Sequence, residues 1–124
     1  MKHVKALEGK GMFRVVMESG SVQGAVMVLG VGKSSSDVPE DEHPKAEQWV
    51  YVVSGSGVAK GRKGRGIQLS AGSMLYIAKN EAHQIKNTGW RKLVTVNFYA
   101  PPAYTKSGEV RRSVVKRAPR RRGV

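Results

Sequence analysis

The chain has 124 residues, no cysteine and a formal net charge of +13, from 22 Lys and Arg against nine Asp and Glu. This length predicts one domain with one modest core, and the lack of cysteine excludes disulfides, thiolate metal ligands and a cysteine nucleophile. No apolar run approaches the roughly 18 residues of a membrane helix, and the first residues lack the apolar stretch of a signal peptide, so we expect no membrane span and a cytoplasmic location.

The basic charge is concentrated near the end of the chain, where residues 106–124 hold eight basic residues and one acid. We therefore predict a flexible N-terminus over residues 1–11, a folded domain over 12–104, and a basic tail over 105–124 that is disordered or loosely attached. The excess charge either keeps the protein soluble or lets the tail contact nucleic acid or another polyanion. Because no aromatic residues alternate with the basic ones, the first interpretation is favoured.

Short runs rich in valine, isoleucine, tyrosine and threonine follow one another along the chain, separated by glycine. None has apolar residues at helical spacing for more than about one turn, so these runs are predicted to be strands. About eight strands, spaced roughly 8 to 15 residues apart, predict an all-β sandwich or barrel. The runs are FRVVME (13–18), AVMVLGV (25–31), QWVYVV (48–53), VAK (58–60), IQLS (67–70), MLYIA (74–78), HQIKN (83–87) and KLVTVNFY (92–99).

Alternation along the third run assigns its residues to two faces. Gln48, Val50 and Val52 share one face, while Trp49 and Tyr51 share the other. A barrel of this size encloses a small cup, and the face with the two valines is the one expected to line it. Gln48 is therefore predicted to point into the cup.

The same alternation gives further candidates for the cup. Asp41 and His43 are predicted to project together if their segment is extended, and His83 shares a face with Ile85. Asn97, in the last run, points into the cup in one of two possible parities. The other parity instead places three apolar residues inside, namely Val94, Val96 and Phe98. Hydrophobicity alone does not decide between the two parities.

The stretch GSMLYIAKNEAHQIKN resembles the second motif of the cupin superfamily, in which glycine, proline, glycine, histidine and asparagine stand at fixed spacings. Every spacing is kept here from Gly72 through His83 to Asn87. Ala78 replaces the proline and Asn80 replaces the second glycine. The second change is mild, because asparagine tolerates the left-handed turn conformation better than most residues do.

The first cupin motif is only partly kept. Counting back from Gly55, Gln48 stands where the family has glutamate and His43 stands at the second histidine. Asp41 takes the place of the first histidine, and Ser35 that of the leading glycine. The resemblance covers most of the predicted domain and implies a small single-domain jelly-roll β-barrel.

The resemblance also implies a metal site. Its ligands would be Asp41, His43, Gln48 and His83, which could hold divalent Fe, Mn, Zn or Ni. The expected ligand pocket beside them includes Val50, Val52, Ile85 and Asn97. His3 is predicted to have no role, and Trp49 and Trp90 are predicted to be packing residues.

Cupins include both enzymes and non-catalytic proteins, so the resemblance does not decide whether this chain is an enzyme. One possibility is a metal-dependent oxygenase or isomerase that binds a small oxygen-rich or anionic ligand. The alternative is a non-catalytic ligand-binding or sensing module without metal, whose basic tail contacts a polyanion. The resemblance further implies a homodimer that pairs through an early strand.

Overall fold

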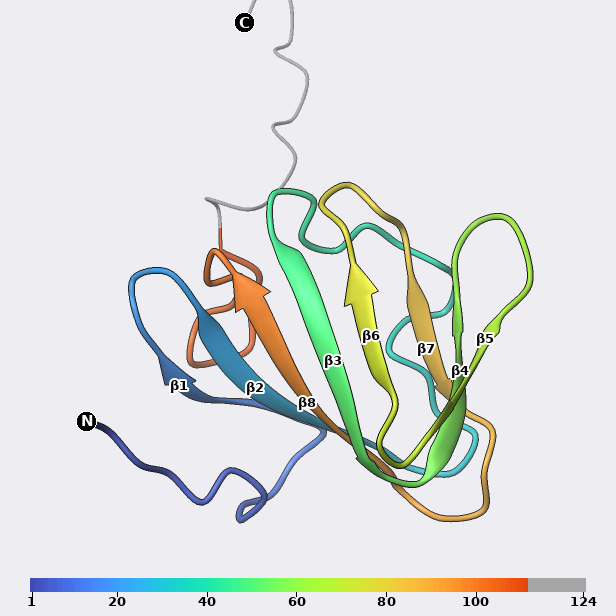
Figure 1. Ribbon diagram of the computed structural model, residues 1–124, viewed down its shortest axis with the longest axis horizontal. Coiled ribbons are helices and arrows are strands. Elements are labelled where there is room, and N and C mark those ends of the chain that lie inside the picture. The colour runs from blue at the N-terminus through green and yellow to red at the C-terminus, as the bar shows by residue number, and fades with distance from the viewer. Residues whose placement is uncertain (112–124) are drawn as a thin grey trace, which may run out of the picture.

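The computed structural model describes residues 1–111, and this part of the chain forms eight strands and no helix (Figure 1). Residues 1–111 therefore contain no helix long and apolar enough to cross a membrane. The strands are β1 (Phe13–Glu18), β2 (Gln23–Leu29), β3 (Glu47–Ser54), β4 (Ser56–Lys60), β5 (Ile67–Ser70), β6 (Met74–Ile77), β7 (Gln84–Asn87) and β8 (Leu93–Ala100).

The strands form two antiparallel sheets. The larger sheet has five strands in the order β1-β2-β8-β3-β6, and the smaller has three in the order β5-β4-β7 (Figure 1). In the larger sheet β8 lies between β2 and β3, so the last strand among the described residues pairs with two early ones. The prediction of an all-β jelly-roll is confirmed.

Alternating side chains from both sheets fill the space between them. On β3, Gln48, Val50 and Val52 are buried, whereas Trp49 and Tyr51 are 43% and 42% exposed, as their alternation predicts. Strand β8 turns its odd-numbered residues inward, which decides the open parity in favour of a buried Asn97. The main core cluster contains Met27, Leu29, Val50, Val52, Ala59, Leu69, Ile77, Ile85 and Leu93.

The turn between β6 and β7 has the backbone that the motif requires. Asn80 has a φ of +63°, in the left-handed region, so asparagine performs the role of the family's glycine. This turn delivers His83 to the first position before β7. The substitution at position 80 therefore leaves the local fold of the motif intact.

The prediction for Trp90 is wrong. Its side chain is 92% exposed, in the loop between β7 and β8, because the neighbouring residues of that loop are themselves at the surface. Trp49 also lies outside the core, on the outer face of the larger sheet. The indole rings therefore contribute little to the interior of this barrel.

After β8 the chain folds back over the barrel in residues 101–111, which we call the closing segment. Within it, Tyr104 pairs with Val110, and the Arg111 Nη2 atom lies 2.6 Å from Glu18 Oε2 on β1. The first part of the predicted loose tail, residues 105–111, thus contacts the barrel. Residues 112–124, on which the predicted polyanion contact mainly depends, lie outside the described residues.

Candidate functional site

His43 lies in the loop between β2 and β3, which bends at residues 42–43 and turns at Pro44. Its ring is almost fully buried, with 2% exposed, and Nδ1 lies 3.1 Å from the main-chain oxygen of Ala46. In the tautomer with the proton on Nδ1, this atom donates a hydrogen bond to the Ala46 carbonyl, which can only accept. The free electron pair of the neutral ring is therefore on Nε2.

His83 has the same arrangement. Its Nδ1 atom lies 3.0 Å from the main-chain oxygen of Glu81, which again leaves Nε2 free. Main-chain hydrogen bonds in both directions with Glu40 tie this residue to the loop that carries His43. The two ring centroids are 5.1 Å apart. Burial lowers the pKa of His83, so this ring is neutral at pH 7.

Gln48, at the start of β3, supplies the third polar group. Its Oε1 atom lies 2.9 Å from His43 Nε2, and its Nε2 atom donates to Asn97 Oδ1 over 2.9 Å. Within residues 1–111, no three His, Cys, Asp or Glu side chains gather where they could hold a metal ion. The polar side chains that meet here are therefore two imidazoles and one amide, with no carboxylate among them.

Asp41 does not lie with the histidines. It lines a separate surface pocket with Glu40, Pro44, Arg62 and Asn80, although it is near enough to have a small raising effect on the pKa of His83. The extended geometry assumed for residues 41–43 fails, because the chain bends at 42–43 before Pro44. The bend turns the neighbouring residue, Glu42, towards the cup instead.

The predicted pocket residues divide into three groups. Ile85 lines the cup, as expected from its shared face with His83. Val50 and Val52 are fully buried in the core cluster. Asn97 lies behind Gln48, to which it is hydrogen bonded.

Next to His83 and Gln48 is a cavity of about 170 Å³. Glu42 is the one Asp, Glu, Lys or Arg among the described residues that line it. Tyr104 Oη donates to Glu42 Oε2 over 3.4 Å, and burial raises the pKa of this carboxyl group. The lining consists of Met12, Phe13, Met27, Ser35, Glu42, Gln48, His83, Ile85, Tyr99, Tyr104 and Gly108.

Tyr99 and Tyr104 form an aromatic wall that sequence reasoning did not identify. Their rings are 5.0 Å apart, and the Tyr99 ring meets the His43 ring edge-on at 5.0 Å. Burial raises the pKa of both phenols, so both are neutral hydrogen-bond donors at pH 7. Alternation from Asn97 would have found Tyr99, whereas no local pattern places Tyr104, which reaches the cavity only because the closing segment folds back.

Comparison with known proteins agrees with this architecture. Solved structures with the same fold include a Bacillus halodurans protein (TM-score 0.73, 21% identity, covering 86% of this chain and 81% of that chain). KdgF from Halomonas sp. is also similar (TM-score 0.64, 17% identity, 73% and 77% covered), as is a predicted oxalate decarboxylase from Thermotoga maritima (TM-score 0.63, 21% identity, 73% and 79% covered). Comparison with curated proteins finds no match. The cupin domain family matches residues 25–99, and the chain belongs to this family.

Proposed function

We propose that this cupin holds a divalent transition-metal ion through the Nε2 atoms of His43 and His83 and the Oε1 atom of Gln48. The observation that supports this proposal is that every other polar atom of these three side chains already makes a hydrogen bond within the protein. Each Nδ1 is used on a main-chain carbonyl, and the Gln48 Nε2 is used on Asn97. Two nitrogen donors and one oxygen donor are left, a set typical of Fe, Mn, Zn or Ni sites.

The lining of the cavity beside this site suits a small oxygen-rich ligand, because two phenols and a serine there could hydrogen bond it. An anionic ligand would need the positive charge of the ion, since the lining holds a carboxyl group and no Lys or Arg among the described residues. Oxalate, the substrate class named for the Thermotoga maritima neighbour, is such an anion. A bound ion would act on this ligand as a Lewis acid, in an oxygenase or isomerase reaction.

Metal content tests the proposal directly. Protein purified without an affinity tag, incubated with Fe, Mn, Zn and Ni salts and then desalted, is expected to retain about one ion per chain. Elemental analysis by mass spectrometry measures this. Retention far below one ion per chain for every metal would contradict the proposal. It would favour the alternative of a metal-free ligand-binding module, since a site without a carboxylate is also what such a module would have.

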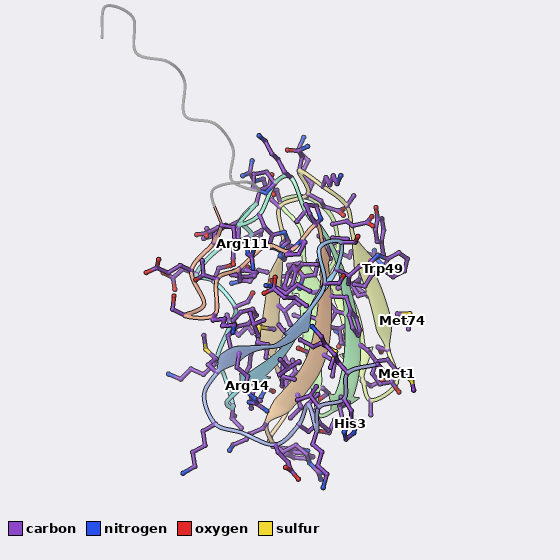
Figure 2. The ribbon with its side chains drawn as sticks, turned by 90° about the vertical axis from the view of Figure 1, so that its left-hand side faces the viewer. Met1, His3, Arg14, Trp49, Met74 and Arg111 are labelled. Carbon is purple, nitrogen blue, oxygen red and sulfur yellow. The ribbon has the colours of Figure 1, made fainter. Side chains whose placement is uncertain are left out.

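We also propose that two copies pair through the outer face of the larger sheet rather than through an early strand. Register places Trp49 between Phe98 and Tyr76, and Tyr51 opposite Met74. These side chains form a contiguous apolar patch, and Figure 2 shows Trp49 and Met74 projecting from the same side, away from Arg111. Their exposed fractions lie between 42% and 68%.

The size and charge of this patch favour a second copy as its partner. Aromatic side chains present about 150–250 Å² each, so the exposed parts of the patch add to roughly 400–500 Å², about half of the ~800 Å² that each partner buries in a standard interface. None of the five patch residues is charged, so two strongly basic chains can meet here without opposing like charges. The patch would form the apolar centre of a two-fold interface with a polar rim.

Light scattering during size-exclusion chromatography is expected to give twice the chain mass of 13.5 kDa for the wild-type protein. Trp49→Glu should give the monomer mass, because it places a charge at the centre of the patch. Trp90→Glu is the matched control, since this exposed tryptophan lies outside the patch, and should remain a dimer. A wild-type monomer, or a Trp49→Glu dimer, would exclude the proposed interface.

A further inference from the structure

Behind Gln48, two buried polar side chains on β8 continue its hydrogen bonding into the barrel. Gln48 Nε2 donates to Asn97 Oδ1, and Asn97 Nδ2 donates to Thr95 Oγ1, each over 2.9 Å. Both β8 residues are 0% exposed, and neither lines the cavity. Their side chains therefore connect to the site through Gln48, to which Asn97 is hydrogen bonded.

The direction of this chain is fixed at its inner end. Thr95 Oγ1 donates its single proton to the main-chain oxygen of Met27, 3.3 Å away, and a carbonyl can only accept. Thr95 is therefore the acceptor for Asn97 Nδ2, which also approaches the main-chain oxygen of Thr95 at 3.5 Å. Asn97 must turn its oxygen towards Gln48, and Gln48 must in turn present its own oxygen to His43.

At the outer end this direction places two acceptors face to face. Both ring nitrogens of His43 face an oxygen that can only accept, Nδ1 at the Ala46 carbonyl and Nε2 at Gln48 Oε1, 2.9 Å away, and a neutral ring has one proton for the two contacts. With that proton on Nδ1, the free electron pair of Nε2 faces Gln48 Oε1. A glutamine free to rotate would present its NH₂ group to Nε2 instead and make an ordinary hydrogen bond. The observed orientation suits a position that receives a positively charged group.

We infer that Thr95 and Asn97 are positioning residues, which hold the Gln48 oxygen at the metal position and thereby allow a neutral amide to stand where the family has a carboxylate. This inference rests on the proposed metal site. A carboxylate needs no such support, because both of its oxygens accept, whereas an amide is a ligand in only one of its two orientations.

Zinc affinity, measured by competition with a chromogenic chelator, tests the inference. Asn97→Leu is expected to weaken zinc binding by about 10- to 100-fold, the range typical of residues that orient a metal ligand. Thr95→Val, which keeps the side-chain shape, should weaken it less but in the same direction. If the leucine variant does not fold, the valine variant still decides the question, because unchanged affinity would overturn the inference.

A rescue experiment separates positioning from simple loss of structure. Combining Asn97→Leu with Gln48→Glu should restore zinc affinity to within a few-fold of wild type, since the orientation of a carboxylate does not matter. The absorption spectrum of bound Co(II) should change in Asn97→Leu and differ again when oxygen ligation returns in the double variant. Failure of Gln48→Glu to restore affinity would contradict the inference.

Asn87→Leu is the matched control. Asn87 is also buried, with 1% exposed, and its amide bonds the main-chain oxygens of Leu29 and Arg91, away from the site. This change should lower stability and leave zinc affinity unchanged. If wild-type protein binds no zinc or Co(II), the proposed function fails and the inference with it; if wild type binds and Asn97→Leu binds equally well, the inference alone fails.

Discussion

Replacing His43 or His83 by alanine is expected to abolish metal retention. In the proposed site each ring supplies one of the two nitrogen donors, and without it an ion would keep one imidazole and one weakly binding amide oxygen. The loss in zinc affinity should exceed the ~10- to 100-fold that follows from disturbing an outer residue. Chelator competition on the folded variants, with circular dichroism to confirm folding, measures the change.

The chain offers its own control for this experiment. His3, the third histidine, lies near the N-terminus and takes no part in the site, so His3→Ala should bind zinc as wild type does. If His3→Ala and His83→Ala lost equal amounts of bound metal, the ion would be held adventitiously by surface groups. Metal content of His83→Ala equal to that of wild type would also exclude the proposed site.

Replacing Gln23 by leucine is expected to destabilise the fold by about 3 kcal/mol or more, because it leaves several buried main-chain groups without partners at ~1–3 kcal/mol each. The Gln23 side chain is fully buried on β2. Its Oε1 atom accepts from the main-chain nitrogens of Ala103 and Tyr104, over 3.1 and 3.0 Å, and its Nε2 atom donates to the Tyr104 oxygen over 2.7 Å. Leucine has a similar volume but can replace none of these bonds.

Urea unfolding measures this loss in the free energy of unfolding, and the m-value is expected to stay unchanged. Gln68→Leu provides the comparison, since Gln68 is exposed on β5 and its replacement should stay within about 0.5 kcal/mol of wild type. Because Gln23 holds Tyr104 at the cavity, Gln23→Leu should also alter the surroundings of Glu42. A stability equal to that of Gln68→Leu would mean that the closing segment is held mainly by other contacts.

Much of the barrel could be predicted from the sequence because strands alternate with a period of two residues. This period correctly placed Gln48 inside and Trp49 outside, and the spacing of the second motif correctly indicated the turn at Asn80 that delivers His83. Both predictions depend on local geometry alone. They concern segments in which each residue's direction follows from that of its neighbour.

Prediction failed where direction depends on distant parts of the chain. The alternation rule assigned Asp41 to the site because it assumed an extended segment, whereas the bend before Pro44 turns Glu42 inward. Both faces of β8 carry apolar residues, so the inward parity of Asn97 is settled only by its pairing with β2 and β3. Tyr104 belongs to the cavity because Gln23, on the second strand, captures the closing segment.

The site is also assembled across the sequence, since four strands, β3 to β6, separate His43 from His83. An unfolded chain would therefore not hold the two imidazoles together, and an ion that binds the native state alone is thermodynamically linked to folding. Free metal at 100 times its Kd would raise the free energy of unfolding by about 2.7 kcal/mol. The persistence of the folded protein would then depend on metal supply, with the melting temperature rising and falling with it.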